Sequence, residues 1–291
     1  MNRRAFLEKS TMAGLGFAFL PSIPEFLKGK KVGVQLWSVR DVMMDAPEKT
    51  LEKIAGMGYK YIEHANYKDG KFYGKTPSAF KQLLKSFGLS MPSGHSSLVL
   101  DSNISDSKAM MEFAKKTAED AAEAGAKYLV QPWLEDKLRN AKSLATVTEA
   151  FNNIGILCKS NGLTFGYHNH DFEFQKVGDT TIYQYMLDNT AKDLVAFEMD
   201  LYWVKFAGQE PVDWIKKYPG RFPLYHVKDM AKTKDRVTIE VGEGSIDFKS
   251  IFEHSRTAGL KYYIVELEHY QTNSMDGVAL AYRNLQTILK G

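Results

Sequence analysis

TAGLKYYIVE, residues 257–266, joins the end of a helical pattern to a β-rich run through a single glycine. Gly259 stands where a helix ends in a left-handed residue, and the apolar run after it is typical of a buried strand. The same joint recurs in four other places: AGMGYKYIE (55–63), KSFGLSM (85–91), EAGAKYLV (123–130) and KSNGLTF (159–165). The recurrence indicates one repeated helix-to-strand unit.

Between these joints, β-rich runs alternate with amphipathic helical patterns along the chain. The expected strands cover 31–37, 59–65, 89–95, 126–133, 163–170, 194–203, 222–229 and 261–268. The expected helices cover 47–56, 77–86, 107–124, 142–160, 180–189, 211–218, 247–258 and 275–290. Such alternation implies right-handed crossovers and a parallel sheet, and this number of units fits a closed barrel. We therefore predict an α/β protein with one domain, a (β/α)8 TIM barrel over residues 31–291.

The composition excludes several classes of protein. The 291 residues are 44% hydrophobic and 25% charged, with a net charge of +3, which is ordinary for a globular chain. No long cluster of lysine or arginine is present, so we expect no nucleic-acid partner. The single cysteine, Cys158, cannot form an internal disulfide and so carries no information about the redox compartment.

The N-terminus, MNRRAFLEKSTMAGLGFAFLPS, differs from the rest of the chain. Two arginines, Arg3 and Arg4, precede an apolar run from about Met12 to Leu20 that is too short to span a bilayer. We expect residues 1–21 to be a twin-arginine-like export signal, which predicts a periplasmic or otherwise exported protein without stable membrane insertion once processed. The alternative is an amphipathic helix docked on the domain, which would leave the protein in the cytoplasm.

Most of the seven histidines fall where the expected strands end. His64, His95, His168, His170 and His226 occupy such positions, His269 follows the last strand, and only His254 is on a helix. Carboxylates join them: Asp200, Asp229, Glu266 and Glu268. In this fold the C-terminal ends of the strands carry the chemistry. Because unpaired buried carboxylates are costly, a divalent metal is the expected partner; a structural polar network is the alternative.

Five motifs, in this order and spacing, resemble the sugar phosphate isomerase/epimerase family, also called xylose isomerase-like barrels: YHNHDFEF (167–174), MDLYW (199–203), YHVKDM (225–230), VGEGSIDF (241–248) and YIVELE (263–268). The resemblance implies one metal ligand from each of the last four strands, typically Glu, Asp, His and Glu. The matching residues here are Asp200, His226 and Glu266. On the fifth strand the family's glutamate position falls on His168, with His170 as the alternative ligand. The ion would be Mn²⁺, Co²⁺, Zn²⁺, Fe²⁺ or Mg²⁺.

The resemblance implies an isomerase or epimerase of a small keto-sugar, which removes a proton beside a metal-polarised carbonyl through an enediolate. Family epimerases place two glutamates on opposite faces of the substrate, whereas this chain has an imidazole in place of one. Glu266 is expected as one catalytic base, with Lys228, His170 or Glu173 as the second group. This departure leaves open a lyase or hydratase acting on a 3-keto-sugar or keto-glycoside, and also a non-catalytic sugar-binding barrel.

Further residues near the mouth of the barrel are expected to contact the sugar. They are Trp37, His64, His95, Glu173 and Trp203. Tryptophan rings at strand ends suit stacking on a sugar face, and packing at the barrel rim explains them equally well. VGEGSIDF is a weak phosphate motif, because no pair of arginines accompanies it, so we expect no phosphorylated substrate. A homodimer is among the assemblies that the sequence leaves open.

Overall fold

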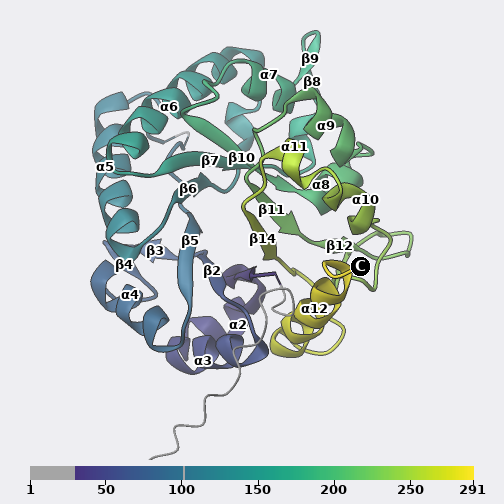
Figure 1. The fold of residues 1–291 in the computed structure, drawn as a ribbon. Helices are drawn as coiled ribbons and strands as arrows, with labels where there is room; N and C mark the ends of the chain where they lie inside the picture. The colour runs from purple at the N-terminus through teal and green to yellow at the C-terminus, as the bar shows by residue number, and fades with distance from the viewer. Residues whose placement is uncertain (1–29, 101) are drawn as a thin grey trace, which may run out of the picture. The chain divides into compact units, whose positions relative to one another are not determined.

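The computed structural model describes residues 30–100 and 102–291, within which eight parallel strands close into a barrel (Figure 1). Around the wall the strands follow the order β1, β14, β11, β10, β7, β6, β5, β2. Their bounds are β1 (Val32–Gln35), β2 (Tyr61–His64), β5 (Ser90–His95), β6 (Tyr128–Gln131), β7 (Thr164–His168), β10 (Val195–Asp200), β11 (Leu224–Val227) and β14 (Tyr262–Val265). The predicted (β/α)8 fold is confirmed.

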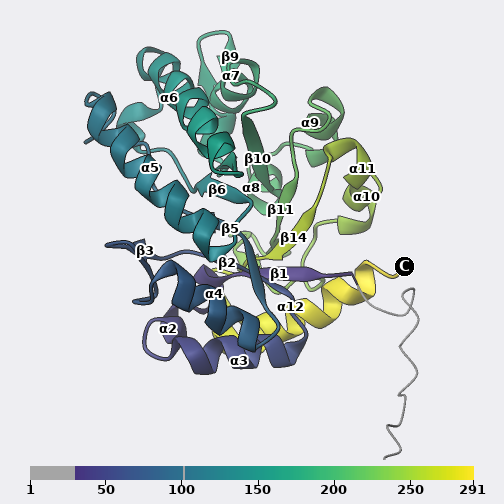
Figure 2. The same ribbon diagram turned by 60° about the vertical axis from the view of Figure 1, so that its left-hand side comes forward.

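Helices lie outside the ring of strands (Figure 2). The longer ones are α3 (Pro47–Met57), α4 (Pro77–Ser86), α5 (Ser107–Ala124), α6 (Ala141–Ser160), α7 (Ile182–Asp188), α9 (Pro211–Lys217) and α12 (Ser274–Ile288). In the part of the chain that the structure describes, no helix has both the length and the apolar character needed to cross a membrane. The expected export signal at 1–21 lies outside the described residues and stays a prediction.

Short helices and hairpins lie in the connections between the longer elements. The short helices are η2 (Leu36–Val39), α2 (Arg40–Met43), η3 (Asp136–Leu138), η4 (Phe172–Phe174), α8 (Leu201–Phe206), α10 (Phe248–Phe252) and α11 (Ser255–Ala258). Two-residue strands pair as hairpins: β3 (Tyr67–Lys68) with β4 (Lys71–Phe72), β8 (Lys176–Val177) with β9 (Thr180–Thr181), and β12 (Asp229–Met230) with β13 (Thr238–Ile239). Several of these elements belong to the loops that follow barrel strands, where the functional site of this fold lies.

The glycine of each repeated joint has a left-handed backbone. Its φ angle is positive at all five positions, as the sequence predicts: Gly58, Gly88, Gly125, Gly162 and Gly259. A residue with a Cβ pays a steric penalty in this conformation, which ends the helix and turns the chain toward the next strand. The recurring glycine is therefore a structural feature of the repeat and not part of a binding loop.

Two expected elements differ from those observed. The run 194–203 is not one strand, because β10 ends at Asp200 and α8 begins at Leu201. The carboxylate of Asp200 accepts a hydrogen bond of 2.9 Å from the backbone N–H of Trp203 and so caps the helix. Trp203 consequently lies on a helix and not at the end of a strand. The run 247–258 forms two short helices, α10 and α11, in place of one.

The interior of the barrel changes from apolar to charged along its axis. Val130, Leu224 and Ile264 form a small buried cluster, with the rings of Tyr128 and Tyr262 packed against it. Because alternate residues of a strand face inward, the inward positions nearer the C-terminal ends follow two residues later. Those positions include His226, after Leu224, and Glu266, after Ile264. The apolar cluster thus forms the floor beneath a layer of ionisable side chains.

Candidate metal centre and active site

Four side chains that can bind a metal meet at the C-terminal ends of neighbouring strands. His168 ends β7, Asp200 ends β10, His226 lies in β11 and Glu266 follows β14. Each offers one nitrogen or carboxylate oxygen, and the four atoms lie within 4.8 Å of one another. All four residues are buried. The structure therefore brings together the four ligands implied by the family resemblance.

The backbone orients the imidazole of His168. Its Nδ1 lies 3.0 Å from the carbonyl oxygen of Pro132, which can only accept a hydrogen bond, so Nδ1 carries the proton. In the neutral ring, Nε2 then presents a lone pair to Asp200 Oδ2 at 3.3 Å. These two electron-rich atoms repel each other unless a proton or a metal ion lies between them. Metal-binding histidines are held in this way, with the second nitrogen donating to a carbonyl or carboxylate.

His226 shows the same arrangement with a carboxylate as its outer partner. Its Nε2 lies 2.7 Å from Glu63 Oε1, and its Nδ1 lies 3.2 Å from Glu266 Oε2. Burial alone would lower the pKa of His226, but the charges of Glu198, Glu266 and Glu63 outweigh burial and raise it well above its ordinary value. The carboxylates around this ring therefore favour a positive charge at its position.

The donor set fits a divalent transition metal. Two imidazole nitrogens with two carboxylate oxygens suit Mn²⁺, Co²⁺, Zn²⁺ or Fe²⁺, whereas Mg²⁺ prefers oxygen ligands alone. A five- or six-coordinate ion held by four protein atoms retains positions for substrate oxygens. The side chains thus have the composition of a catalytic metal centre, and several ions satisfy it.

Lys228 adds a fixed positive charge beside the four ligands. Its Nζ donates to Glu266 Oε2 at 2.8 Å and to Glu268 Oε1 at 2.6 Å, and lies 3.4 Å from Asp200 Oδ2. Burial would lower the pKa of this ammonium, but the three carboxylates outweigh burial and raise it. Burial would in turn raise the pKa of Glu266, but Lys228 and His226 outweigh burial and lower it well below its ordinary value. Glu266 is therefore ionised.

The position of Lys228 argues against the direct catalytic role expected from the sequence. The side chain is fully buried, and it does not belong to the wall of the cavity described below. Its Nζ is 5.3 Å from the ring centre of Trp203, so an aromatic side chain packs close to the ammonium. The structure thus gives Lys228 a positioning role, in which it holds Glu266 and Glu268.

A second group of ionisable side chains lies next to the first and shares His226 with it. His95 Nε2 is 2.7 Å from Glu198 Oε2 and 3.2 Å from Glu63 Oε1. Burial would lower the pKa of His95, but the charge of Glu63 and the hydrogen bonds and charge of Glu198 raise it to about 9. His95 is therefore an imidazolium at neutral pH. Glu63 was not expected at this site from the sequence, although a glutamate that interrupts the apolar strand YIEH was the available signal.

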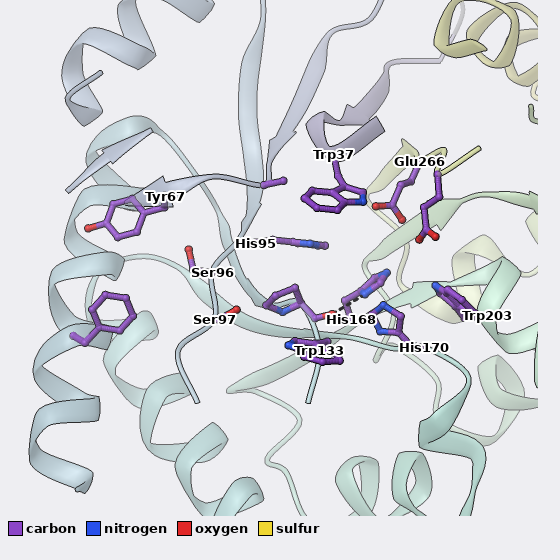
Figure 3. Close-up of a pocket in the computed structure, with 14 residues that line it drawn as sticks. Trp37, Tyr67, His95, Ser96, Ser97, Trp133, His168, His170, Trp203 and Glu266 are labelled. Atoms are coloured by element: carbon purple, nitrogen blue, oxygen red, sulfur yellow. Dashed lines mark hydrogen bonds between the residues drawn. The ribbon is translucent and has the colours of Figure 1, made fainter. Parts of the chain in front are cut away.

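A cavity of about 800 Å³ opens next to these groups (Figure 3). Its walls comprise Trp37, Ala65, Tyr67, His95, Ser96, Ser97, Phe113, Pro132, Trp133, His168, His170, Trp203, Glu266 and Glu268. Seven of the residues singled out in the sequence thus line it: Trp37, His95, His168, His170, Trp203, Glu266 and Glu268. Burial, with the nearby charges of His168 and Lys228, lowers the pKa of His170 well below its ordinary value. His170 is therefore a neutral imidazole, and its Nδ1 has no partner among the described residues.

Two residues expected to bind substrate do not line the cavity. His64 is fully buried, and its ring lies 4.7 Å from that of Phe72, while Gly94 leaves the space that its imidazole occupies. Glu173 is fully buried beneath the wall, where its carboxyl group pairs with the hydroxyl of Tyr167 at 2.6 Å and accepts from the backbone N–H of His170 at 2.8 Å. Both residues support the wall from behind, and neither has direct access to a ligand.

Backbone N–H groups of the glycine-rich loop VGEGSIDF already have hydrogen-bond acceptors within the protein. Asp229 accepts hydrogen bonds from the backbone N–H groups of Gly242 at 2.9 Å, Gly244 at 3.0 Å and Ile246 at 3.1 Å. A Cβ at Gly244 would approach the Asp229 carboxylate to 2.3 Å, so only glycine fits there. These N–H groups hold a carboxylate of the chain itself, which explains the motif without a bound phosphate.

Comparison with known proteins places the chain among barrels of related architecture. The model of the xylose isomerase-like TIM barrel family matches residues 51–288. A solved structure of a sugar phosphate isomerase/epimerase from Parabacteroides distasonis ATCC 8503 is 32% identical and superposes with a TM-score of 0.78. That match covers 89% of this chain and 94% of the other. A structure of the IOLI protein with a bound zinc atom shares the fold, with a TM-score of 0.70 at 15% identity over 89% of this chain and 98% of the other.

The chain also matches part of a curated protein. Inosose dehydratase from Clostridium perfringens is 28% identical over 130 residues, which is 39% of this chain. The match spans 43% of the length of that relative. The chain thus covers less than half of this curated protein.

Proposed function

Because the chain belongs to the xylose isomerase-like TIM barrel family, we propose that it is a metal-dependent enzyme acting on a small carbohydrate. In this proposal it removes a proton from the carbon beside a carbonyl and couples that step to the loss of water or an alcohol from the next carbon. The reverse reaction, addition across the same bond, uses the same groups. The enzyme would thus be a lyase or hydratase of keto-sugars.

One observation carries the proposal. The cavity wall has carboxylates on one side and imidazoles on the other, and both kinds of group can transfer protons. Carboxylates come from the end of β14, as Glu266 and Glu268, whereas β5 and β7 contribute imidazoles. The family resemblance implies that epimerisation uses a glutamate on each face of the substrate, whereas this chain has an imidazole in place of one of them. Elimination needs one base and one acid, which a carboxylate and an imidazolium supply.

The chain's own residues then divide the work. A divalent metal held by His168, Asp200, His226 and Glu266 would supply Lewis-acid polarisation of the substrate carbonyl. Glu266, kept ionised beside Lys228, takes the proton from the carbon next to that carbonyl. The C–H electron pair forms the new double bond as the C–O bond at the next carbon breaks. His95 donates a proton to the departing oxygen, and the neutral imidazole of His170 in the cavity wall orients a substrate hydroxyl.

Isomerisation or epimerisation of a keto-sugar is the second candidate. It is favoured by the similarity at 32% identity to a structure described as a sugar phosphate isomerase/epimerase. Both reactions begin with removal of the same proton. The similarity to an inosose dehydratase also supports elimination, which we place first because of the two kinds of proton-transfer group in the cavity wall.

A Glu266→Gln variant tests the proton transfer when elemental analysis shows that it carries as much metal as the native chain, because Glu266 is also a metal ligand in this proposal. The metal-loaded protein is incubated with a panel of keto-sugars in deuterated water, and exchange beside the carbonyl is followed by NMR while enone formation is followed by absorbance. We expect the native chain to catalyse exchange, and the variant to lose this activity by about 10³-fold while still binding sugar. Glu149→Gln, at an exposed position of α6, is the matched control.

The products separate the two candidates. Accumulation of an enone or of its hydrated form supports the lyase or hydratase, whereas an inverted or shifted carbonyl product would establish the isomerase or epimerase. Absence of exchange in the metal-loaded native chain, for every keto-sugar tested, would contradict both.

A further inference from the structure

The cavity extends well beyond the metal-binding side chains. Figure 3 shows Glu266, His170 and Trp203 on one side of His95, and Tyr67, Ser96 and Ser97 on the other. The volume of about 800 Å³ is in the upper part of the range of roughly 300–1,000 Å³ that accepts drug-sized ligands. A single hexose is much smaller than such a ligand, so it leaves the far side of this cavity empty. We call this far side, formed by Tyr67, Ser96, Ser97 and Phe113 and bordered toward His168 and His170 by Trp133, the outer subsite.

Aromatic surface is concentrated at the cavity. Among the described residues, the large hydrophobic side chains with the greatest exposure include Trp37 (47%), Phe113 (45%) and Trp133 (41%), and all three line its walls. They come from separate elements, the segment after β1, helix α5 and the segment after β6. Exposed apolar rings gathered from distant parts of a chain mark a binding surface more often than isolated ones do. Flat rings of this kind suit the apolar face of a sugar ring.

The exposed rings are held in place from behind. Arg139 lies 5.1 Å from the ring centre of Trp133, and its Nε donates to the Leu134 carbonyl at 2.8 Å. The carbonyl of Trp133 itself accepts from Gln131 Nε2 at 2.8 Å. At the opposite wall, the hydroxyl of Tyr67 donates to Asp120 Oδ2 at 2.6 Å. The subsite is therefore preorganised, which reduces the entropy lost on binding.

A polar atom in the outer subsite lacks a partner. Ser96 is 6% exposed and belongs to the cavity wall, and its Oγ is buried just behind the surface of that wall without a hydrogen bond to any described residue. A buried hydroxyl without a partner costs free energy, which a ligand hydroxyl at this place would recover. An aromatic wall with a free hydroxyl at its side matches a pyranose, which has an apolar face and hydroxyls at its edge.

We infer that the outer subsite binds the leaving group of the substrate and that this group is a second sugar ring. The inference rests on the proposed function and narrows its substrate class to keto-glycosides, in particular 3-keto-disaccharides. The proton leaves the carbon between the ketone and the anomeric carbon, the pair forms the double bond, and the glycosidic C–O bond breaks. The departing oxygen takes a proton, so the products are an enone and a free sugar. No oxidant or reductant is consumed.

The test compares two substrates that release the same enone, methyl 3-keto-β-glucoside and 3-keto-cellobiose. Enone absorbance gives kcat/KM for each with the native metal-loaded chain, Trp133→Ala and Ser96→Ala. We expect Trp133→Ala to lower kcat/KM for the disaccharide about tenfold and Ser96→Ala about threefold to tenfold, with little change for the methyl glycoside. Ile156→Ala, an exposed apolar residue on α6 outside this cavity, should change neither.

Other results would contradict the outer subsite, the second sugar ring or the proposed function. Equal losses for both substrates, or no loss in either variant, would overturn the outer subsite. A loss in Trp133→Ala that is larger for 4-nitrophenyl 3-keto-β-glucoside than for the disaccharide, with no loss for the disaccharide in Ser96→Ala, would replace the sugar ring by an aromatic group and overturn the inference. If neither glycoside reacts while keto-monosaccharides exchange deuterium, the inference fails and the proposed function stands. If no keto-sugar exchanges deuterium, the proposed function itself fails.

Discussion

The two halves of the barrel mouth are built on different principles. At the ends of β7, β10, β11 and β14 the side chains are buried and ionisable, and they pair with one another. After β1, β2, β5 and β6 the walls are largely aromatic, and Trp37 and Trp133 are each more than two-fifths exposed. The first half owes its geometry to the strands, whereas the second owes it to loops, η2 and helix α5. The reacting groups then lie on rigid strand ends, while loops that vary between proteins contact the rest of the substrate. One fold can therefore act on different substrates.

The largest effect should follow a change of one carboxylate in the strand-built half. Asp200→Asn keeps the cap on α8 but removes a charged metal ligand, so we expect metal affinity to fall at least about 100-fold. Elemental analysis after dialysis measures the metal content, which we expect to be about one ion per native chain. Chelator competition measures the metal affinity of the native chain and of the variant. Asp247→Asn, an exposed helix cap at α10, is the control. Equal metal content in both variants would refute the metal centre.

A second prediction concerns the pKa of Glu173, which is buried behind the cavity wall. Burial raises the pKa of Glu173 from its ordinary value of 4.5 to about 8, despite the opposing hydrogen bonds. The folded chain therefore keeps a proton that the unfolded chain releases, so the stabilising contribution is complete below pH 4.5 and disappears as the pH rises through about 8. Glu173→Gln cannot ionise, and its amide can still pair with Tyr167 and His170.

The variant should match the native chain at pH 5 and exceed its free energy of unfolding by about 2–4 kcal/mol at pH 9.5. Denaturant unfolding at both pH values, with Glu149→Gln alongside, measures the difference. Identical pH profiles for the native chain and Glu173→Gln would mean that Glu173 remains ionised throughout and that its burial does not control its titration.

The contrast between the halves also explains what the sequence could predict. The joints at Gly58 and Gly259 follow from local conformational rules, so such joints located five of the eight barrel strands in advance, and β-rich runs located the other three. His226 and Asp200 were recognisable as ligand candidates because strand ends of a parallel barrel converge. Strand periodicity gave the direction of a side chain but not its depth, so His64 and Glu173 were expected in the cavity and lie behind its wall.

The loop-built half was largely beyond prediction from one chain. Ser96, Ser97 and Phe113 are ordinary residues in sequence, and only the path of the loops and of α5 brings them to the cavity. Glu63 and Glu198 could be placed on strands, but their pairing with His95 depends on contacts between three strands. Local sequence patterns determine the helices, the strands and the positions where strands end. The tertiary fold determines which side chains come together in one site.

The smallest expected effect separates recognition from stability. Trp37 is 47% exposed, and Arg40 lies 4.8 Å from its ring centre, so Trp37→Ala should change the free energy of unfolding by less than about 1 kcal/mol. Trp214, which is 8% exposed and packs on Phe174 and Tyr183, is the matched tryptophan, and Trp214→Ala should cost about 3–5 kcal/mol. Urea unfolding of both variants measures the difference. A comparable cost at Trp37 would mean that the aromatic half holds the barrel together, and its exposed rings would no longer indicate a surface reserved for ligands.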